Sequence, residues 1–333
     1  MTPALAAPLF VASIALMLLA SAQFAQRLDH IGLRLGLPET VLGVLTAVAT
    51  DAPEISSAIS ALVQNAHAVA VGVVVGSNAF NLASMLGLSA ILAGRVRARH
   101  EALELEGFVA LWVVAVACAV AAGGLDATLG MALSALVALP YVTLLVAGPR
   151  LARRLPLGLG RSVFVQRSFG ERHRPERTLD SRREIARLAV VLLVALSLIV
   201  AGSIGAVRSA LDLAHAWSVP DVFVGVIVLS ILTSLPEAWT GIRFGLQGRG
   251  SALMSDALNS NSVNILAGIA LPAAVGTLAG FSHLAVFDLG WLLMMTAAAL
   301  LLFGRRGGGG RRAGGFLIVL YVVFLAVQIA VSG

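Results

Sequence analysis

The sequence carries two copies of one polar pattern, in which a threonine is followed by a Pro-Glu pair and then by a serine and two asparagines. The first copy comprises Thr50, Pro53, Glu54, Ser77, Asn78 and Asn81, and the second comprises Thr233, Pro236, Glu237, Ser260, Asn261 and Asn264. Each residue of the second copy follows its counterpart by 183 positions, as Glu237 follows Glu54 (237 − 54). Because carboxylates and amides are costly to bury, their repetition in register inside apolar sequence points to a functional site.

The Pro-Glu pair predicts a cation site built from oxygen atoms. Proline lacks an N–H and clashes with the preceding turn, so a helix should break or kink at Pro53 and leave carbonyl oxygens that lipid cannot satisfy. A cation can bind those carbonyls together with Thr50 and Glu54 and their counterparts in the second copy. Calcium prefers about six to eight oxygen ligands, and two carboxylates balance its charge. Zinc would require His or Cys, and neither lies near the pattern.

The serine and asparagines form the second half of the pattern. Ser77 and Asn81 are four residues apart, so they share a helix face, and their counterparts do the same. We expect these hydroxyls and amides either to coordinate a monovalent ion or to hold the carboxylates in place. Asn78 and Asn261 have a simpler alternative, which is to hydrogen-bond neighbouring helices.

Glycines near the pattern predict close helix packing. Gly72 and Gly76 are four residues apart on one helix, as are Gly241 and Gly245 on another, and small residues at this spacing let backbones approach. Asn259 stands at the position of Gly76 in the second copy. A later run of glycines, 307–310, is expected from its composition to be a flexible turn.

Composition places the chain in a membrane. Of its 333 residues, 59% are hydrophobic and only 12% are charged, and the mean hydropathy is +0.94. A soluble protein would carry about a quarter charged residues. The net charge of +6 does not indicate nucleic-acid binding, because the arginines fall in short loops between apolar runs. Cys118 is the only cysteine, which excludes an intramolecular disulfide and a cysteine-based metal site.

The apolar runs predict an all-α polytopic membrane protein of about ten transmembrane helices. We expect spans near residues 5–25, 38–63, 67–92, 104–123, 128–148, 185–207, 219–245, 250–277, 284–303 and 314–332. The N-terminal run lacks a preceding basic region, so we interpret it as a span and not as a cleaved signal. Arginine-rich loops follow the odd-numbered spans, so we expect these loops in the cytoplasm and both termini on the outer side of the cell membrane.

The arginine-rich segment 150–184 divides the chain into two halves, 1–149 and 185–333. We interpret this segment as a cytoplasmic linker, with headgroup binding or regulation as the alternative. Five spans per half make the second half enter the membrane from the opposite side. The halves are therefore expected to form two inverted repeats with broken helices at the centre, an arrangement typical of secondary transporters.

The two copies resemble the signature repeats of the cation/calcium exchanger superfamily, and especially those of the prokaryotic sodium/calcium exchangers. Those proteins carry G-T-S-x-P-E and G-S-N-x-F-N/D sequences in inverted repeats, and the resemblance covers the whole chain except the arginine-rich segment. It implies a calcium site formed by Glu54, Glu237, Thr50 and Thr233. It also implies sodium ligands from Ser77, Ser260, Ser234 and the backbone at Ala47 and Ser230, with Asn81 and Asn264 flanking the centre.

The resemblance implies an antiporter that exchanges calcium for sodium by alternating access. We expect such a protein to use the lipid bilayer and inorganic cations as its partners, to need no cofactor, and to function as a monomer without enzymatic activity. An intramembrane hydrolase is the alternative from another class, with the central carboxylates as acid–base groups. The sequence supplies no nucleophile for it, and it leaves the inverted symmetry unexplained.

Departures from the family pattern lie at the centre of the expected site. Ala49 and Leu232 replace the family's glycine, Asp51 replaces its first-repeat serine, and Asn264 replaces an acidic residue. Asp51 would add a third carboxylate to the site, and three carboxylates around a divalent ion leave excess negative charge. One of them could carry a proton, which favours a proton-coupled exchanger of calcium or another divalent cation as the alternative function.

Two acidic residues near the pattern have simpler roles open to them. Asp51 could cap the N-terminus of a half-helix instead of joining the site. Asp256 either joins the site or lies at the cytoplasmic end of its helix.

Overall fold

The computed structural model describes residues 1–34, 47–98, 100–152, 182–278, 280–305 and 307–332. Its helices are α1 (Pro3–Arg34), α3 (Ala52–Val63), α4 (His67–Asn81), α5 (Ser89–Leu92), α6 (His100–Ala121), α7 (Ala127–Ala152), α9 (Arg182–Ala216), α10 (Asp221–Phe223), α11 (Ser230–Leu246), α12 (Gly250–Ile265), α13 (Leu271–Ala274), α14 (His283–Phe303) and α15 (Arg311–Ser332). Three π-helical turns, η1 (Leu82–Leu88), η2 (Val224–Leu229) and η3 (Leu266–Ala270), continue α4, α10 and α12. Most of the arginine-rich segment lies outside the described residues.

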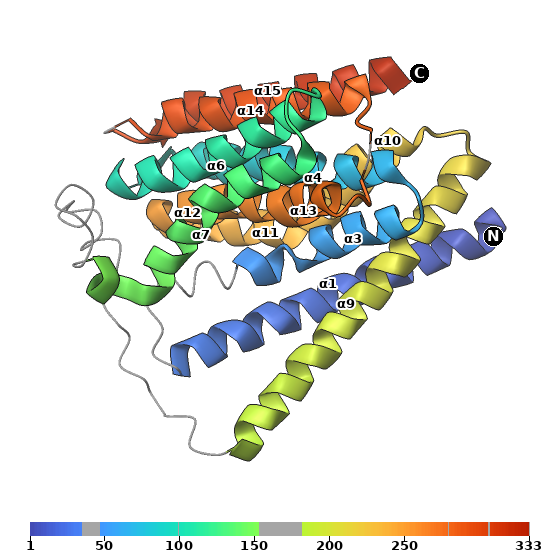
Figure 1. The fold of residues 1–333 in the computed structure, drawn as a ribbon, viewed down its shortest axis with the longest axis horizontal. Helices are drawn as coiled ribbons and strands as arrows, with labels where there is room; N and C mark the ends of the chain where they lie inside the picture. Colours follow the sequence, from blue (N-terminus) through green and yellow to red (C-terminus); the bar gives the residue numbers. More distant parts are fainter. Residues whose placement is uncertain (35–46, 99, 153–181, 279, 306, 333) are drawn as a thin grey trace.

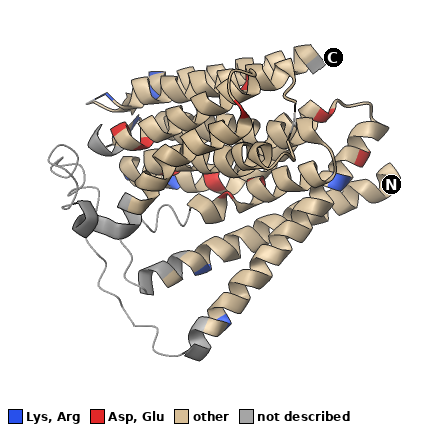
Figure 2. Ribbon diagram, in the orientation of Figure 1, with Lys and Arg blue, Asp and Glu red and all other residues tan. Residues whose placement is uncertain are grey.

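The helices fit the expected polytopic architecture. Seven helical units among the described residues are long and apolar enough to cross a membrane. The shorter apolar helices at 52–63 and 127–143 and the polar unit α12–η3–α13 occupy the other three expected spans. Figure 2 shows long stretches of these helices without a charged residue, as a lipid-facing surface requires. Figure 1 shows both termini at the same end of the bundle.

The internal repeat extends from the sequence into the helix boundaries. Helix α3 ends at Val63 and α11 at Leu246, while α4 begins at His67 and α12 at Gly250. Both pairs of boundaries are separated by 183 positions, the offset of the polar pattern. A π-helical turn follows α4 as η1 and follows α12 as η3. The two halves of the chain therefore repeat one structural unit around the polar pattern.

The helix break expected at the two prolines occurs in one copy only. Residues 47–50 are helical, Asp51 forms a bend, and α3 then begins with Pro53 in its first turn. In the second copy, α11 continues through Pro236 without interruption, so the helix does not break there. The backbone irregularity of this copy lies before α11, in the wider π-helical turn η2. Such turns allow a helix to bend without ending.

Glycines let α4 approach the η2–α11 unit closely, as the spacing predicts. A Cβ atom on Gly76 would lie 2.5 Å from the carbonyl oxygen of Val226 and 2.8 Å from Ser230 Oγ. A Cβ on Gly72 would lie 3.0 Å from Val226. The second predicted pair is confirmed in the same way, because Gly241 packs against Met85. The two repeats thus pack closely at positions where glycine has no side chain.

Replacing Gly76 with alanine should destabilise the protein. The added methyl group has no free space, and overpacking of this kind costs about 1–3 kcal/mol. We expect the Gly76→Ala variant to unfold in detergent at a midpoint several degrees lower than the wild type. Gly290→Ala is the matched control, since Gly290 lies inside α14 and a Cβ there meets no atom within 4 Å. Equal midpoints for the two variants would contradict the close-approach interpretation.

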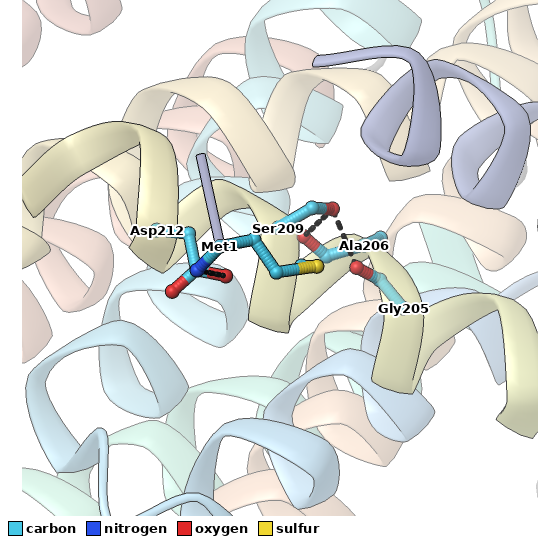
Figure 3. Close-up of polar contacts among 5 residues, drawn as sticks. All are labelled: Met1, Gly205, Ala206, Ser209 and Asp212. Carbon is cyan, nitrogen blue, oxygen red and sulfur yellow. Dashed lines mark hydrogen bonds and ion pairs between the residues drawn. The ribbon is translucent and has the colours of Figure 1, made fainter. Parts of the chain in front are cut away.

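Helices α1 and α9 form a pair that crosses the bundle at an angle to α14 and α15 (Figure 1). Gly202 of α9 faces the backbone of α1 at Ser13. Ser203 of α9 is hydrogen-bonded to Ser60 of α3 at 3.2 Å, so the pair is also tied to the helix that follows Asp51. At the end of the pair, the amino group of Met1 lies 3.2 Å from Asp212 Oδ2 (Figure 3).

The glycine run 307–310 is not the flexible turn that its composition suggests. Gly309 and Gly310 form strand β2, which pairs antiparallel with β1 (Arg95–Val96). Glycine is required here, because Gly308 has a φ of +70° and a Cβ on Gly309 would lie 2.4 Å from the Phe303 ring. The pairing brings together the loops after the expected third and ninth spans, which agrees with their predicted placement on one side of the membrane.

Candidate cation site

The polar pattern gathers at the contact between the two repeats. One copy lies on residues 47–51, α3 and α4, and the other lies on α11 and α12. All but one of the fourteen expected site residues expose at most 2% of their surface; these are Ala47, Asp51, Glu54, Ser77, Asn78, Asn81, Ser230, Thr233, Ser234, Glu237, Ser260, Asn261 and Asn264. Thr50 is half-buried. The site is therefore closed to solvent in this conformation.

Each of the three central carboxyl groups accepts a hydrogen bond from the opposite repeat. Ser234 Oγ donates to Glu54 Oε1 at 2.8 Å, and Ser260 Oγ donates to Asp51 Oδ1 at 2.6 Å. The Asn81 amide donates to Glu237 Oε2. The carboxyl groups are thus oriented by side chains that lie on the other side of the repeat interface.

The asparagines connect these bonds into one network around Ser260. The Asn264 amide lies 3.1 Å from Asn78 Oδ1 and 3.5 Å from Asp51 Oδ1. Ser260 Oγ lies 3.4 Å from the Asn264 nitrogen and 3.5 Å from the Asn81 nitrogen. The amide nitrogens therefore point towards the carboxyl groups, as expected of residues that hold the carboxylates.

The same network leaves six buried oxygen atoms without a hydrogen-bond donor. They are Asp51 Oδ2, Glu54 Oε2, Glu237 Oε1, Asn81 Oδ1, Asn261 Oδ1 and Asn264 Oδ1. Buried acceptors in proteins normally have a partner. A set of unpartnered carboxylate and amide oxygens is the kind of donor set that calcium and sodium prefer. These residues therefore fit a hard cation as cargo.

The three carboxyl groups also lie close together, without an ion-pair partner among the described residues. Asp51 and Glu54 both lie close enough to Glu237 for their charges to interact. The ion pairs between described residues, Met1–Asp212 and His215–Asp221, involve none of the three. Unpaired carboxylates inside a membrane are expensive. In the described parts of the chain, no three acidic or metal-binding side chains converge in metal-ligand geometry, so the carboxyl groups surround the site without forming a closed cage.

Several expected site residues bind their own helix in this conformation. Thr50 Oγ1 donates to the Ala47 carbonyl at 3.0 Å, and Thr233 Oγ1 donates to the Ser230 carbonyl at 3.2 Å, so the two copies match. Ser77 Oγ donates to the Val74 carbonyl at 3.1 Å. These hydroxyls lie beside the network, and Thr233 also lies within hydrogen-bonding reach of Glu54.

The structure also decides between the alternatives for the remaining residues. Asp51 makes no side-chain hydrogen bond as a helix cap, so its role is in the network. Asn261 donates to Thr296 of α14 at 2.8 Å, and Asn78 donates to the Asn261 carbonyl at 3.5 Å, so both also join helices. The role of Thr296 could not be predicted from the sequence, because a lone threonine in an apolar span has no distinguishing pattern. Asp256 is half-buried, one turn before Ser260.

Two known proteins are similar to this chain in sequence. The sodium/calcium exchanger MaX1 of Methanosarcina acetivorans is 33% identical over 90 residues, which cover 27% of this chain and 25% of MaX1. The inner membrane protein YrbG of Escherichia coli is 26% identical over 242 residues, which cover 72% of this chain and 70% of YrbG. The chain thus matches only a quarter of the first relative and about two thirds of the second.

Solved structures share the fold over nearly the full chain. The sodium-calcium exchanger NCX_Mj superposes with a TM-score of 0.60 and 21% identity, covering 98% of this chain and 99% of that one. YfkE superposes with a TM-score of 0.63 and 15% identity, covering 96% and 90%. The family model described as sodium/calcium exchanger protein matches residues 5–147 and 187–330, which hold both copies of the polar pattern, and the chain therefore belongs to that family.

Proposed function

We propose that the protein is a secondary active antiporter that exchanges calcium for sodium across the membrane. The observation that carries this proposal is the set of six unpartnered oxygens at the repeat interface. Carboxylates from both repeats supply negative charge, and buried hydroxyls and amides supply neutral oxygens. A site that holds calcium or sodium, but not both at once, couples the two fluxes. Membership of an exchanger family favours this function over an intramembrane hydrolase.

Alternating access follows from the burial of the site. Because the central side chains expose at most 2% of their surface, an ion can leave only after helices separate on one side. The carboxyl groups are held by bonds between repeats, so relative motion of the repeats changes the site itself. An ion that restores these bonds stabilises the closed state, which permits the site to reopen on the other side.

Proton coupling is the second candidate, and Asp51 is the observation that favours it. This third carboxyl accepts a bond from Ser260 at 2.6 Å and keeps one oxygen without a donor. A divalent ion with three ionised carboxylates leaves one negative charge in the membrane. Protons that bind the carboxyl groups when calcium departs, and leave when calcium arrives, would limit the unbalanced charge and couple the two movements in opposite directions.

The organisation around the site is part of the same proposal. Residues 1–149 and 185–333 form the two exchanger repeats, and 150–184 form a cytoplasmic linker. The arginine distribution supports an orientation in the cell membrane with both termini on the outer side. A complete set of oxygens lies within one chain, which supports function as a monomer.

The test is uptake of labelled calcium into vesicles that contain the purified protein, with sodium and pH gradients imposed separately. Calcium uptake that follows the sodium gradient supports the first candidate. Uptake that follows only the pH gradient supports the second. Absence of gradient-dependent uptake under both conditions would overturn antiport.

A further inference from the structure

A second buried polar cluster lies beside the cation site, on another face of α12. It consists of Glu106 of α6, Tyr141 of α7, and Ser255 and Asn259 of α12. Tyr141 donates to Asn259 Oδ1 at 2.8 Å, Asn259 Nδ2 lies 3.2 Å from Ser255 Oγ, and Ser255 Oγ donates to Glu106 Oε1 at 2.7 Å. The donors all point in the same direction, so Glu106 is the terminal acceptor of the chain.

Glu106 has one oxygen that nothing in this cluster satisfies. Its side chain is only 8% exposed, and Oε2 is buried without a hydrogen-bond partner. The ion pairs between described residues do not include it. An ionised carboxylate in such a place keeps several kcal/mol of uncompensated desolvation. A single positive charge at Oε2 would remove that cost.

The described side chains of the helices that pack against Glu106 provide no such charge. On α12, the charge of Asp256 interacts with Glu237 of the central site, and on α7 the Tyr141 hydroxyl donates to Asn259. Helix α14 packs against α6 where Gly107 faces Leu300, while its titratable residues, His283 and Asp288, lie near its other end. On α6 itself, Glu104 is exposed. Bound sodium would need further oxygen ligands, whereas a proton needs only the carboxyl oxygen.

We propose that Glu106 is a proton-binding site, separate from the central cation site, whose occupancy controls how firmly α12 is held by α6 and α7. An ionised Glu106 accepts a charge-assisted bond from Ser255, which is about twice as strong as the bond to a neutral carboxyl group. Since α12 also carries Ser260, binding of a proton at Glu106 loosens one wall of the cation site. Exchange therefore responds to pH through a residue that binds no cargo.

The internal repeat shows that only one of the two matching helices, α12 and not α4, is held in this way. Asn259, which links Tyr141 to Ser255, stands where the first repeat has Gly76. Gly76 packs directly against Val226 and Ser230, with no space for a side chain. Helix α4 is thus fixed by close packing, and α12 by a hydrogen-bond chain that ends on a titratable group. Because of this difference, a proton can loosen the packing of α12 but not that of α4.

Infrared spectroscopy tests the proton directly and needs no transport. The carboxylic-acid C=O band is followed against pH in the purified protein with saturating calcium, and the Glu106→Gln spectrum is subtracted at each pH so that other buried carboxyl groups, such as Asp51 and Asp288, cancel. We expect a titrating component in the wild type that is absent from Glu106→Gln and present in Glu104→Gln, the exposed control. Identical titrations in the wild type and Glu106→Gln would overturn the proposal. Loss of the band on addition of sodium at constant pH would also overturn it, because the occupant would then be sodium.

The consequence for exchange is tested by the pH profile of calcium uptake in vesicles. We expect the wild-type rate to change by about fivefold between the ionised and protonated forms, the factor that corresponds to one hydrogen bond. Glu106→Gln should flatten this step without changing calcium affinity, and Glu104→Gln should retain it. An unchanged profile in Glu106→Gln would overturn the control of α12. If the protein proves not to exchange calcium, the infrared result still decides the proton site.

Discussion

Glu54→Gln and Glu237→Gln should each abolish calcium exchange while leaving the protein folded. Each carboxyl has one oxygen held by the opposite repeat and one oxygen without a donor. A unit charge about 4 Å from another contributes about 4 kcal/mol at an effective dielectric constant of 20. Loss of one carboxylate charge therefore corresponds to a fall in calcium affinity of about a thousandfold. Glutamine has nearly the same shape, so the hydrogen bonds that orient the site can persist.

Thermal unfolding in detergent with and without calcium measures this effect apart from transport. A ligand present at 100 times its Kd stabilises the native state by about 2.7 kcal/mol. We expect calcium to raise the unfolding midpoint of the wild type and of the exposed control Glu104→Gln, but not that of Glu54→Gln or Glu237→Gln. Without calcium, the two site variants should be at least as stable as the wild type, because each removes a charge from a crowded group. A calcium-dependent shift that survives in both variants would exclude these carboxylates as calcium ligands.

The parts of the site that could be predicted from the sequence are those that depend on local chemistry repeated at one offset. Thr50 and Thr233 make the same bond to the carbonyl three residues earlier, because each lies on a helix, where a threonine hydroxyl can reach the carbonyl of the preceding turn. Gly76 was predictable as a packing position for the same kind of reason, since small residues at helical spacing favour close approach. The carboxyl groups stood out because ionisable residues in apolar sequence are rare and usually functional.

The parts that could not be predicted depend on contacts between distant segments. Ser255 and Glu106 are far apart in the sequence, and neither belongs to a recognisable motif. The pairing of Gly309 with Val96 is equally invisible, because composition alone makes a glycine run look like a turn. Pro236 shows a different limit, since the cost of a proline inside a helix depends on whether the backbone can bend nearby, and η2 lies just before α11.

Moving the third carboxylate from residue 51 to residue 264 should show whether calcium binding depends on the charge of this group or on where that charge lies. Asp51→Asn removes the charge and should weaken calcium binding by about 10–100-fold, the loss typical of residues that orient metal ligands. Adding Asn264→Asp to that variant returns the charge to a residue that lies 3.5 Å from Asp51 and 3.4 Å from Ser260. We expect the double variant to recover most of the lost affinity, because Ser260 can donate to either carboxylate. Calcium binding in the wild type, both single variants and the double variant forms a double-mutant cycle, which isolates the coupling between the two positions.

The same four proteins show whether the location of the carboxylate selects the coupling ion. Asp51 is held by Ser260 at 2.6 Å on the broken end of the first repeat, whereas residue 264 lies within the continuous helix α12. If Asp51 carries the exchanged proton, Asp51→Asn should lose the calcium uptake driven by a pH gradient and keep the uptake driven by sodium. The double variant should then follow the sodium gradient more strongly than the wild type does. Failure of Asn264→Asp to restore calcium binding would show that Asp51 acts through the geometry of its bond to Ser260, since the charge of the site would have been restored without effect.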